Sequence, residues 1–212
     1  MISCEKKEKS AIIIQSCYRG YIVRKKLREL TDNMSFSLMS KLINRYNQNL
    51  IFVKKFNKLL SKKKIRNENF PSHISENIAK YAIYKKYKIM PCWDTKKGDI
   101  VIDKLNLQIE VKGFMSDGPT SFGPTENWDL IYFVDCRKTL EKKFKVYEVK
   151  LSNRDEKFRS IKLNKTDTYG DICDKNQRGK LRGCFEKIFK PQLGDECKLI
   201  FDGVLKELDN RV

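Results

Sequence analysis

Apolar side chains recur at helical spacing through the first part of the chain. Residues 1–30 carry isoleucine, tyrosine, valine and leucine on one stripe of a basic segment, which predicts a helix capped by Ser10. Residues 34–66, rich in lysine, asparagine, leucine and phenylalanine, predict one or two further helices. Residues 75–88 repeat the pattern. The first part of the chain is therefore expected to be mainly helical.

From Pro91 onward the apolar runs become short and alternate with polar residues, which is typical of strands. Residues 170–190, rich in glycine, arginine and lysine, predict a partly helical segment, and residues 197–208 predict a last strand and helix. This order of elements predicts an α/β or α+β fold, with a central mixed sheet flanked by helices. The strands expected in the middle of the chain are residues 99–103, 107–112, 129–135 and 144–151.

A change of composition marks a domain boundary. The length of 212 residues allows one domain with a sizeable core and an appendage. The charged run "SKKKIRNENFPS" contains Pro71 and separates the basic helical part from the remainder of the chain. We therefore predict a basic helical segment of residues 1–66 and a folded domain of residues 67–212.

The charge of the chain favours a polyanionic partner. There are 45 lysine and arginine residues against 27 aspartate and glutamate residues, so the formal net charge is +18. A protein this basic attracts phosphate backbones, and nucleic acid is the commonest polyanion. The alternative is a lysine-rich composition that serves only solubility.

Cysteine and histidine usage excludes several classes of site. No two cysteines have the C-x-x-C spacing, and there is one histidine, so a zinc ribbon, a C2H2 finger and a histidine-metal nuclease are disfavoured. The N-terminus lacks the pattern of a signal peptide, and no run of 18 apolar residues exists to cross a membrane. We expect an intracellular protein, in the cytoplasm or nucleus, with reduced thiols at Cys4, Cys17, Cys92, Cys136, Cys173, Cys184 and Cys197.

The stretch "GDIVIDKLNLQIEVKG" predicts a hairpin that carries charged side chains on one face. A turn at Lys104–Leu105 places Asp99 opposite Glu110, with their Cβ atoms about 4.5–5.5 Å apart, and points Lys112 to the same face. Two opposed carboxylates repel unless a cation lies between them. Mg²⁺ is a hard ion that is often held by one or two carboxylates. The ammonium of Lys112 is suited to orient a water molecule or to stabilise charge on a phosphate.

This arrangement resembles the PD-(D/E)XK nucleases, the fold of most type II restriction endonucleases. Asp99, Glu110 and Lys112 match the acidic residue and the acidic-x-lysine of that motif, and Glu76 matches a frequent helix glutamate. The resemblance covers about residues 70–205 and departs from the motif at Gly98, where proline is usual. It implies Mg²⁺-dependent hydrolysis of double-stranded DNA at a specific sequence, a homodimer and a companion DNA methyltransferase.

Two alternatives to this site remain open from the sequence. Asp135, with Glu148 and Lys150 in "YEVK", repeats the same motif later in the chain. We favour the first set because a tight hairpin opposes its acids, Gly113 and a glycine- and serine-rich loop follow it, and a helix with a glutamate precedes it. The other alternative is an ordinary cross-strand ion pair on a solvated face.

Two segments carry side chains suited to DNA. The loop "SDGPTSFGPTENWD" follows the acidic-x-lysine strand and offers hydroxyl donors for phosphates or base edges. The segment "YGDICDKNQRGKLRG" offers arginine, lysine and glutamine, which read guanine and adenine, although it is also compatible with phosphate contacts alone. The candidate DNA-binding residues are Ser116, Thr120, Ser121, Thr125, Gln177, Arg178, Lys180 and Arg182.

The N-terminal segment "IQSCYRGYIVR" resembles the IQ motif, I-Q-x-x-x-R-G-x-x-x-R. A basic helix with an apolar face suits the acidic groove of a calmodulin-like protein. The alternatives are a helix that packs on residues 34–66 and a basic arm that touches DNA. The residues that match the fixed positions are Ile14, Gln15, Arg19, Gly20 and Arg24.

The sequence therefore predicts a type II restriction endonuclease that depends on Mg²⁺. A junction resolvase or repair nuclease of the same fold is the nearest alternative. A non-catalytic DNA-binding or calmodulin-binding protein is the alternative from a different class.

Overall fold

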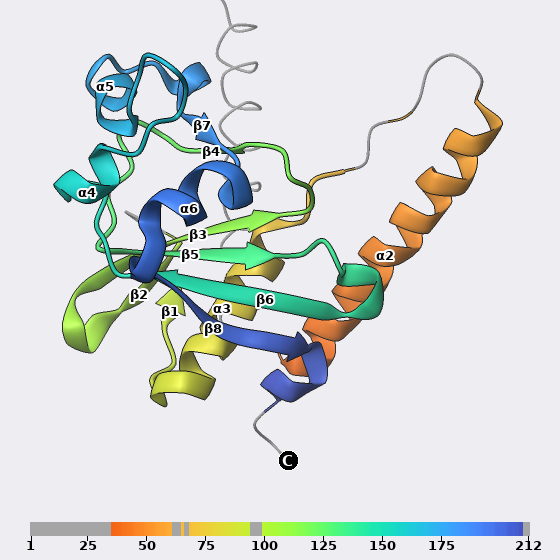
Figure 1. Ribbon diagram of the computed structural model, residues 1–212. Coiled ribbons are helices and arrows are strands. Elements are labelled where there is room, and N and C mark those ends of the chain that lie inside the picture. The colour runs from red at the N-terminus through yellow and green to blue at the C-terminus, as the bar shows by residue number, and fades with distance from the viewer. Residues whose placement is uncertain (1–34, 61–64, 66–67, 94–98, 210–212) are drawn as a thin grey trace, which may run out of the picture. The chain divides into compact units, whose positions relative to one another are not determined.

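The computed structural model describes residues 35–60, 65, 68–93 and 99–209 (Figure 1). The chain divides into two compact units, residues 1–35 and 36–212, and the described helices and strands belong to the second. The helix expected over residues 1–30, with its cap at Ser10, lies outside the described residues. The division into residues 1–66 and 67–212 stays a prediction, although the first helix of the second unit begins at residue 36.

The second unit is built on a six-stranded mixed sheet, which confirms the predicted fold class. Its strand order is β1-β2-β3-β5-β6-β8, and β3 and β5 are parallel while the other neighbours are antiparallel. The strands are β1 (Cys92–Trp93), β2 (Ile100–Ile102), β3 (Leu107–Phe114), β5 (Leu130–Asp135), β6 (Lys143–Val149) and β8 (Cys197–Val204). A separate antiparallel pair joins β4 (Thr120–Ser121) to β7 (Arg182–Gly183). The four predicted central strands are found within two residues of their expected ends.

The longer helices occur where the apolar pattern predicts them. The structure has a single helix, α2 (Phe36–Leu59), within residues 34–66, and α3 (Ser72–Tyr87) corresponds to the helix expected over residues 75–88. The later helices are short: α4 (Glu156–Arg159), α5 (Tyr169–Asp174), a π-helix (Phe185–Phe189) and α6 (Lys190–Leu193). The chain continues after β8 in a 3₁₀ helix, Leu205–Leu208.

Helices cover both faces of the sheet (Figure 1). Helix α3 crosses one face and contacts β3, β5, β6 and β8. On the other face, Phe133 of β5 packs against the rings of Phe185 and Phe189, with ring centroids 4.5 and 5.6 Å apart. Strand β5, the run "LIYFVD", is buried along almost its whole length because it lies between these two layers.

Helix α2 packs against α3 and against the 3₁₀ turn Thr139–Glu141. Met39 and Ile43 are fully buried, and Asn47 donates to the carbonyl of Thr139 at 2.7 Å. The second half of the helix extends away from the sheet (Figure 1), and Phe52 is 63% exposed there. Residues 36–59 therefore belong to the same compact unit as the strands.

The described residues bear on two expectations about the chain's environment. Among them, no helix has both the length and the apolar character needed to cross a lipid bilayer. Cys136, Cys173, Cys184 and Cys197 in this part of the chain are thiols outside any disulfide.

Candidate active site

The hairpin of β2 and β3 brings Asp99 and Glu110 together. Ile100 pairs with Ile109 and Val101 with Gln108, so the next positions along this register are 99 and 110. The backbone N–H of Asp99 donates to the carbonyl of Ile109 at 3.3 Å. The two acids therefore oppose each other as the alternation of the sequence predicts.

The carboxylate of Asp99 is fixed against the second strand. Its Oδ2 accepts a hydrogen bond from the backbone N–H of Val111 at 2.8 Å. Because the hydrogen bond from Val111 holds the carboxylate of Asp99 against β3, this carboxylate has little freedom to turn into solvent.

Glu110 and Lys112 lie on the same face of β3. The ammonium of Lys112 contacts Oε1 of Glu110 directly. The side chains of Lys112 and Glu110 are 17% and 6% exposed, so the pair is close to the surface but largely shielded from water. The Lys112 Nζ also lies 5.3 Å from the centre of the Phe122 ring, and Phe122 itself is buried. The predicted alternation of Glu110 and Lys112 against Ile109 and Val111 is thus present in the structure.

Glu76 reaches the same place from α3. It follows Ser75, and a Cβ atom placed on Gly113 of β3 would lie 2.7 Å from both Cβ and Oγ of Ser75. Glycine at position 113 therefore allows the helix and the strand to approach closely, which brings Glu76 to the acids of the hairpin. Glu76 is buried, with 4% of its surface exposed.

Burial raises the pKa values of the three carboxyl groups, and repulsion from Asp99 adds to the shifts of Glu76 and Glu110. Burial and the nearby Asp99 raise the pKa of Glu76 to about 8. Burial raises the pKa of Glu110 to about 7, although Lys112 opposes the shift. Burial likewise raises the pKa of Asp99, against the Val111 hydrogen bond and the charge of Lys112. The charge of Lys112 therefore opposes these shifts without outweighing burial.

The pKa of Lys112 itself is raised. Burial acts to lower it, but the carboxylates of Glu110, Glu126 and Asp99 outweigh burial. The ammonium consequently stays protonated at neutral pH and is available as a fixed positive charge.

Sequence reasoning missed Glu126. It lies in the loop between β4 and β5, and its Oε2 is 3.5 Å from the Nζ of Lys112. The only signal in the sequence is its place in the polar loop after the acidic-x-lysine strand, which does not distinguish it from other loop residues. Lys112 therefore lies between two carboxylates, one from its own strand and one from this loop.

The alternative acid pair does not form a site. Asp135 pairs with Lys145 across the sheet while Glu148 pairs with Tyr132, so the two acids project from opposite faces of the sheet. Asp135 forms hydrogen bonds with Arg137 at 2.9 and 2.6 Å. Glu148 accepts from the hydroxyl of Tyr132 at 2.6 Å and is fully buried. These acids are structural ion-pair and hydrogen-bond partners.

The two candidate DNA-binding segments meet in the short sheet of β4 and β7. Thr120 pairs with Gly183 and Ser121 with Arg182, although about 60 residues separate them in the chain. The hydroxyl of Thr120 donates to the carbonyl of Gly183 at 3.1 Å. The guanidinium of Arg182 is held by the carbonyl of Gly179 at 2.8 Å. Ser116, Ser121, Thr125, Gln177, Arg178, Lys180 and Arg182 are exposed, and Thr120 is half-buried.

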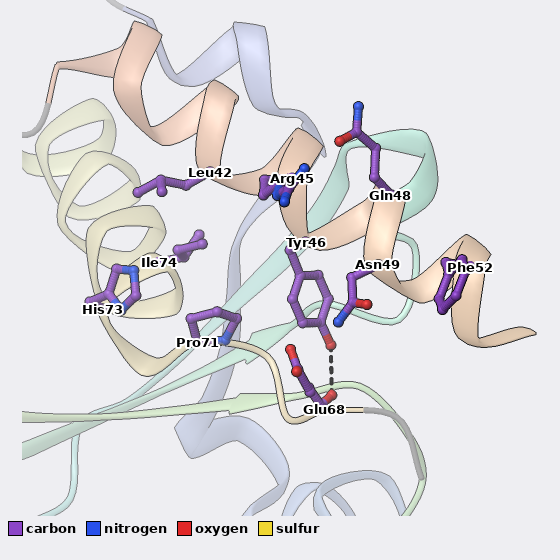
Figure 2. A pocket seen from close by; sticks show the side chains of 10 residues that line it. All are labelled: Leu42, Arg45, Tyr46, Gln48, Asn49, Phe52, Glu68, Pro71, His73 and Ile74. Atoms are coloured by element: carbon purple, nitrogen blue, oxygen red, sulfur yellow. Dashed lines mark hydrogen bonds between the residues drawn. The ribbon is translucent and has the colours of Figure 1, made fainter. Parts of the chain in front are cut away.

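A pocket of about 570 Å³ lies elsewhere, between α2 and the start of α3 (Figure 2). Figure 2 shows the hydroxyl of Tyr46 donating to the backbone carbonyl of Glu68, at 2.9 Å. Arg45 and His73 also line it, and burial lowers the pKa of His73. The carboxylates of the hairpin do not line this pocket, so the charged cluster and the pocket are separate features.

Comparisons with known proteins give two family matches. The family model described as Bsp6I restriction endonuclease matches residues 37–186. The model described as IQ calmodulin-binding motif matches residues 8–28. No curated protein and no solved structure matches the chain. The matched IQ residues, Ile14, Gln15, Arg19, Gly20 and Arg24, lie outside the described residues.

Proposed function

Because the chain belongs to the Bsp6I restriction endonuclease family, we propose that it is a magnesium-dependent endonuclease that cuts double-stranded DNA at a specific sequence. The observation that supports this most is the convergence of Asp99, Glu110 and Lys112 on one face of the β2–β3 hairpin. The family makes the chain a nuclease of restriction type, and the metal, the residues and the sequence specificity are the proposal.

The residues of the cluster fit a divalent cation. Asp99 and Glu110 offer oxygen atoms, which a hard ion such as Mg²⁺ prefers. Burial raises the pKa values of both carboxyl groups, and a bound cation would favour their charged forms. Among the described residues, no group of three or more histidine, cysteine, aspartate or glutamate side chains is arranged to hold a metal ion. In the site we propose, Asp99 and Glu110 would hold the cation together with phosphate oxygens of the DNA.

Each residue has a separate task in hydrolysis. Asp99 and Glu110 would hold Mg²⁺, which polarises the phosphate and lowers the pKa of bound water when present. Lys112 orients the attacking water and stabilises charge on the scissile phosphate. Glu76 assists as a further carboxyl group next to Asp99, and a bound cation would favour its charged form over the neutral one. Water forms a new bond to phosphorus, the bond to the leaving sugar oxygen breaks, and a proton from the water passes to that oxygen.

We propose that the exposed residues of β4, β7 and their loops contact DNA. Phosphate contacts by lysine and arginine supply affinity that falls with salt, and the net charge of +18 favours them. Arg178, Lys180 and Arg182, with Gln177, are the side chains we assign to base edges. Cutting both strands at a symmetric site favours a homodimer with one active site for each strand.

Cleavage of plasmid DNA tests this proposal. With Mg²⁺ the wild-type protein is expected to give a few discrete fragments with identical ends, and with chelator none. Asp99→Ala and Lys112→Ala are expected to be inactive while retaining the wild-type melting temperature within a few degrees. Cleavage of branched DNA alone would indicate a junction resolvase. If the wild type and both variants leave every DNA substrate intact, the proposal that the protein is an enzyme is contradicted.

We also propose, from the match at residues 8–28, that the N-terminal segment binds an acidic calmodulin-like protein. Titration of the full chain with calmodulin, with and without Ca²⁺, measures this. The variant with both Arg19 and Arg24 changed to alanine is expected to bind at least tenfold more weakly. Equal binding by that variant and the wild type would contradict this proposal without affecting the nuclease proposal.

A further inference from the structure

Lys112 is shared by two carboxylates that differ in their surroundings. Glu110 faces Asp99 in the hairpin, whereas Glu126 approaches from the loop and places its Oε2 3.5 Å from the ammonium. The side chain of Glu126 is 34% exposed, compared with 6% for Glu110. Glu126 therefore contacts the lysine from the solvent side.

The fold holds the Glu126 loop in place. Asn153, which is 5% exposed, donates to the carbonyl of Glu126 at 2.6 Å and accepts from the backbone N–H of Trp128 at 3.3 Å. A Cβ atom on Gly123 would lie 2.6 Å from Oε1 of Glu126, so glycine leaves room for that carboxylate. Trp128 is buried in the core beneath the loop. The position of Glu126 is thus specified by packing and hydrogen bonds around it.

The charges change when a divalent cation binds to Asp99 and Glu110. Glu110 would then bind the cation, and Lys112 would lose the carboxylate that it contacts most closely. An ammonium beside a divalent cation is repelled unless another negative group compensates it. Glu126 is the carboxylate already within reach, and it belongs to no metal-holding group of three among the described residues.

We propose that Glu126 is a positioning residue that retains Lys112 beside the scissile phosphate once the divalent cation has taken Glu110. This inference rests on the proposed nuclease function. Without Glu126, Lys112 remains paired with Glu110 and competes with the cation for that carboxylate. Glu126 therefore acts on the metal site through Lys112.

Binding of Mn²⁺ to the full-length protein without DNA tests this, with free Mn²⁺ measured by electron paramagnetic resonance. Glu126→Gln is expected to weaken Mn²⁺ binding three- to tenfold. In a Lys112→Met background, the same change is expected to alter binding less than twofold, because the competing ammonium is gone. The matched control is Glu196→Gln, since Glu196 is 39% exposed and its Oε1 is 3.3 Å from Lys157, away from the cluster.

The outcomes separate the possible roles of Glu126. An equal loss of Mn²⁺ binding in both backgrounds would make Glu126 a metal ligand and overturn the inference, as would no loss in either. Loss of binding in Glu126→Gln but not in Asp99→Asn would instead contradict the proposed metal site itself. In cleavage assays, Glu126→Gln is expected to lower the single-turnover rate more than DNA affinity, and Glu126→Asp to recover part of that rate.

Discussion

Replacing Gly113 with alanine tests whether close contact between α3 and β3 builds the candidate active site. The new Cβ would lie 2.7 Å from Cβ and Oγ of Ser75, whereas carbon atoms in contact are normally about 3.5–4.0 Å apart. The helix and the strand must therefore separate by about 1 Å. Because Glu76 follows Ser75 and Lys112 precedes Gly113, this separation moves the helix acid away from the hairpin.

The size of the effect depends on packing energetics. Forcing one extra methyl group into a packed contact costs about 1–3 kcal/mol, and in a domain of this size each kcal/mol lowers the melting temperature by about 2–4 °C. Displacement of catalytic groups by about 1 Å lowers rates by on the order of 100-fold. Thermal unfolding and the rate of plasmid cleavage are the two measurements.

Two second-site variants distinguish this mechanism from general destabilisation. Ser75→Gly removes the clashing Cβ, so combined with Gly113→Ala it is expected to restore cleavage, apart from about 1 kcal/mol lost by glycine within a helix. Ser75→Ala retains that Cβ and is expected to restore nothing. Wild-type stability of Gly113→Ala, or equal rescue by the two second-site changes, would refute the close contact.

Three further changes separate the roles of charged residues. In metal-free protein, the raised pKa of Glu76, about 8, means that the folded state binds a proton more tightly than the unfolded chain. The free energy of unfolding is therefore expected to fall as pH rises from about 4.5 to 8, and denaturant titrations should show a smaller fall in Glu76→Gln than in the wild type. Glu148→Gln breaks a buried hydrogen-bond network and should cost about 1–3 kcal/mol of stability yet leave plasmid cleavage within about twofold, whereas Glu110→Gln should abolish cleavage. Equal loss of cleavage in these two variants would restore the later acid pair as a candidate. Arg137 forms ion pairs with Asp117 and Glu186, which lie in or next to the two candidate DNA-binding segments. Arg137→Met removes these ion pairs, so DNA affinity in a filter-binding assay should fall about threefold to tenfold, while Mn²⁺ affinity should stay unchanged.

The hairpin was predictable because its determinants are local. Alternating side chains and a short turn specify the register between Ile100 and Ile109, and this register alone brings Asp99 opposite Glu110. The helix of Glu76 was predictable from its apolar spacing. The distance between that helix and the sheet could not be predicted from the pattern of residues, because it depends on the close contact between Gly113 and Ser75.

Contacts between segments distant in the chain could not be predicted from the sequence. The pairing of Thr120 with Gly183 joins two loops that the sequence identifies only as separate polar segments. Glu126 reaches Lys112 because Asn153, much later in the chain, holds its backbone. Neither contact produces a periodic pattern, since each depends on the tertiary arrangement of short irregular segments. The roles of these residues in binding and catalysis stay predictions.

A crystal structure of the protein soaked in Mn²⁺, with the anomalous signal of the metal recorded, tests the central claim most directly. We predict an anomalous peak between the carboxylates of Asp99 and Glu110, and its loss in Asp99→Asn. A peak at Glu148 or Asp135, or none at the hairpin while the protein cleaves DNA, would contradict the account.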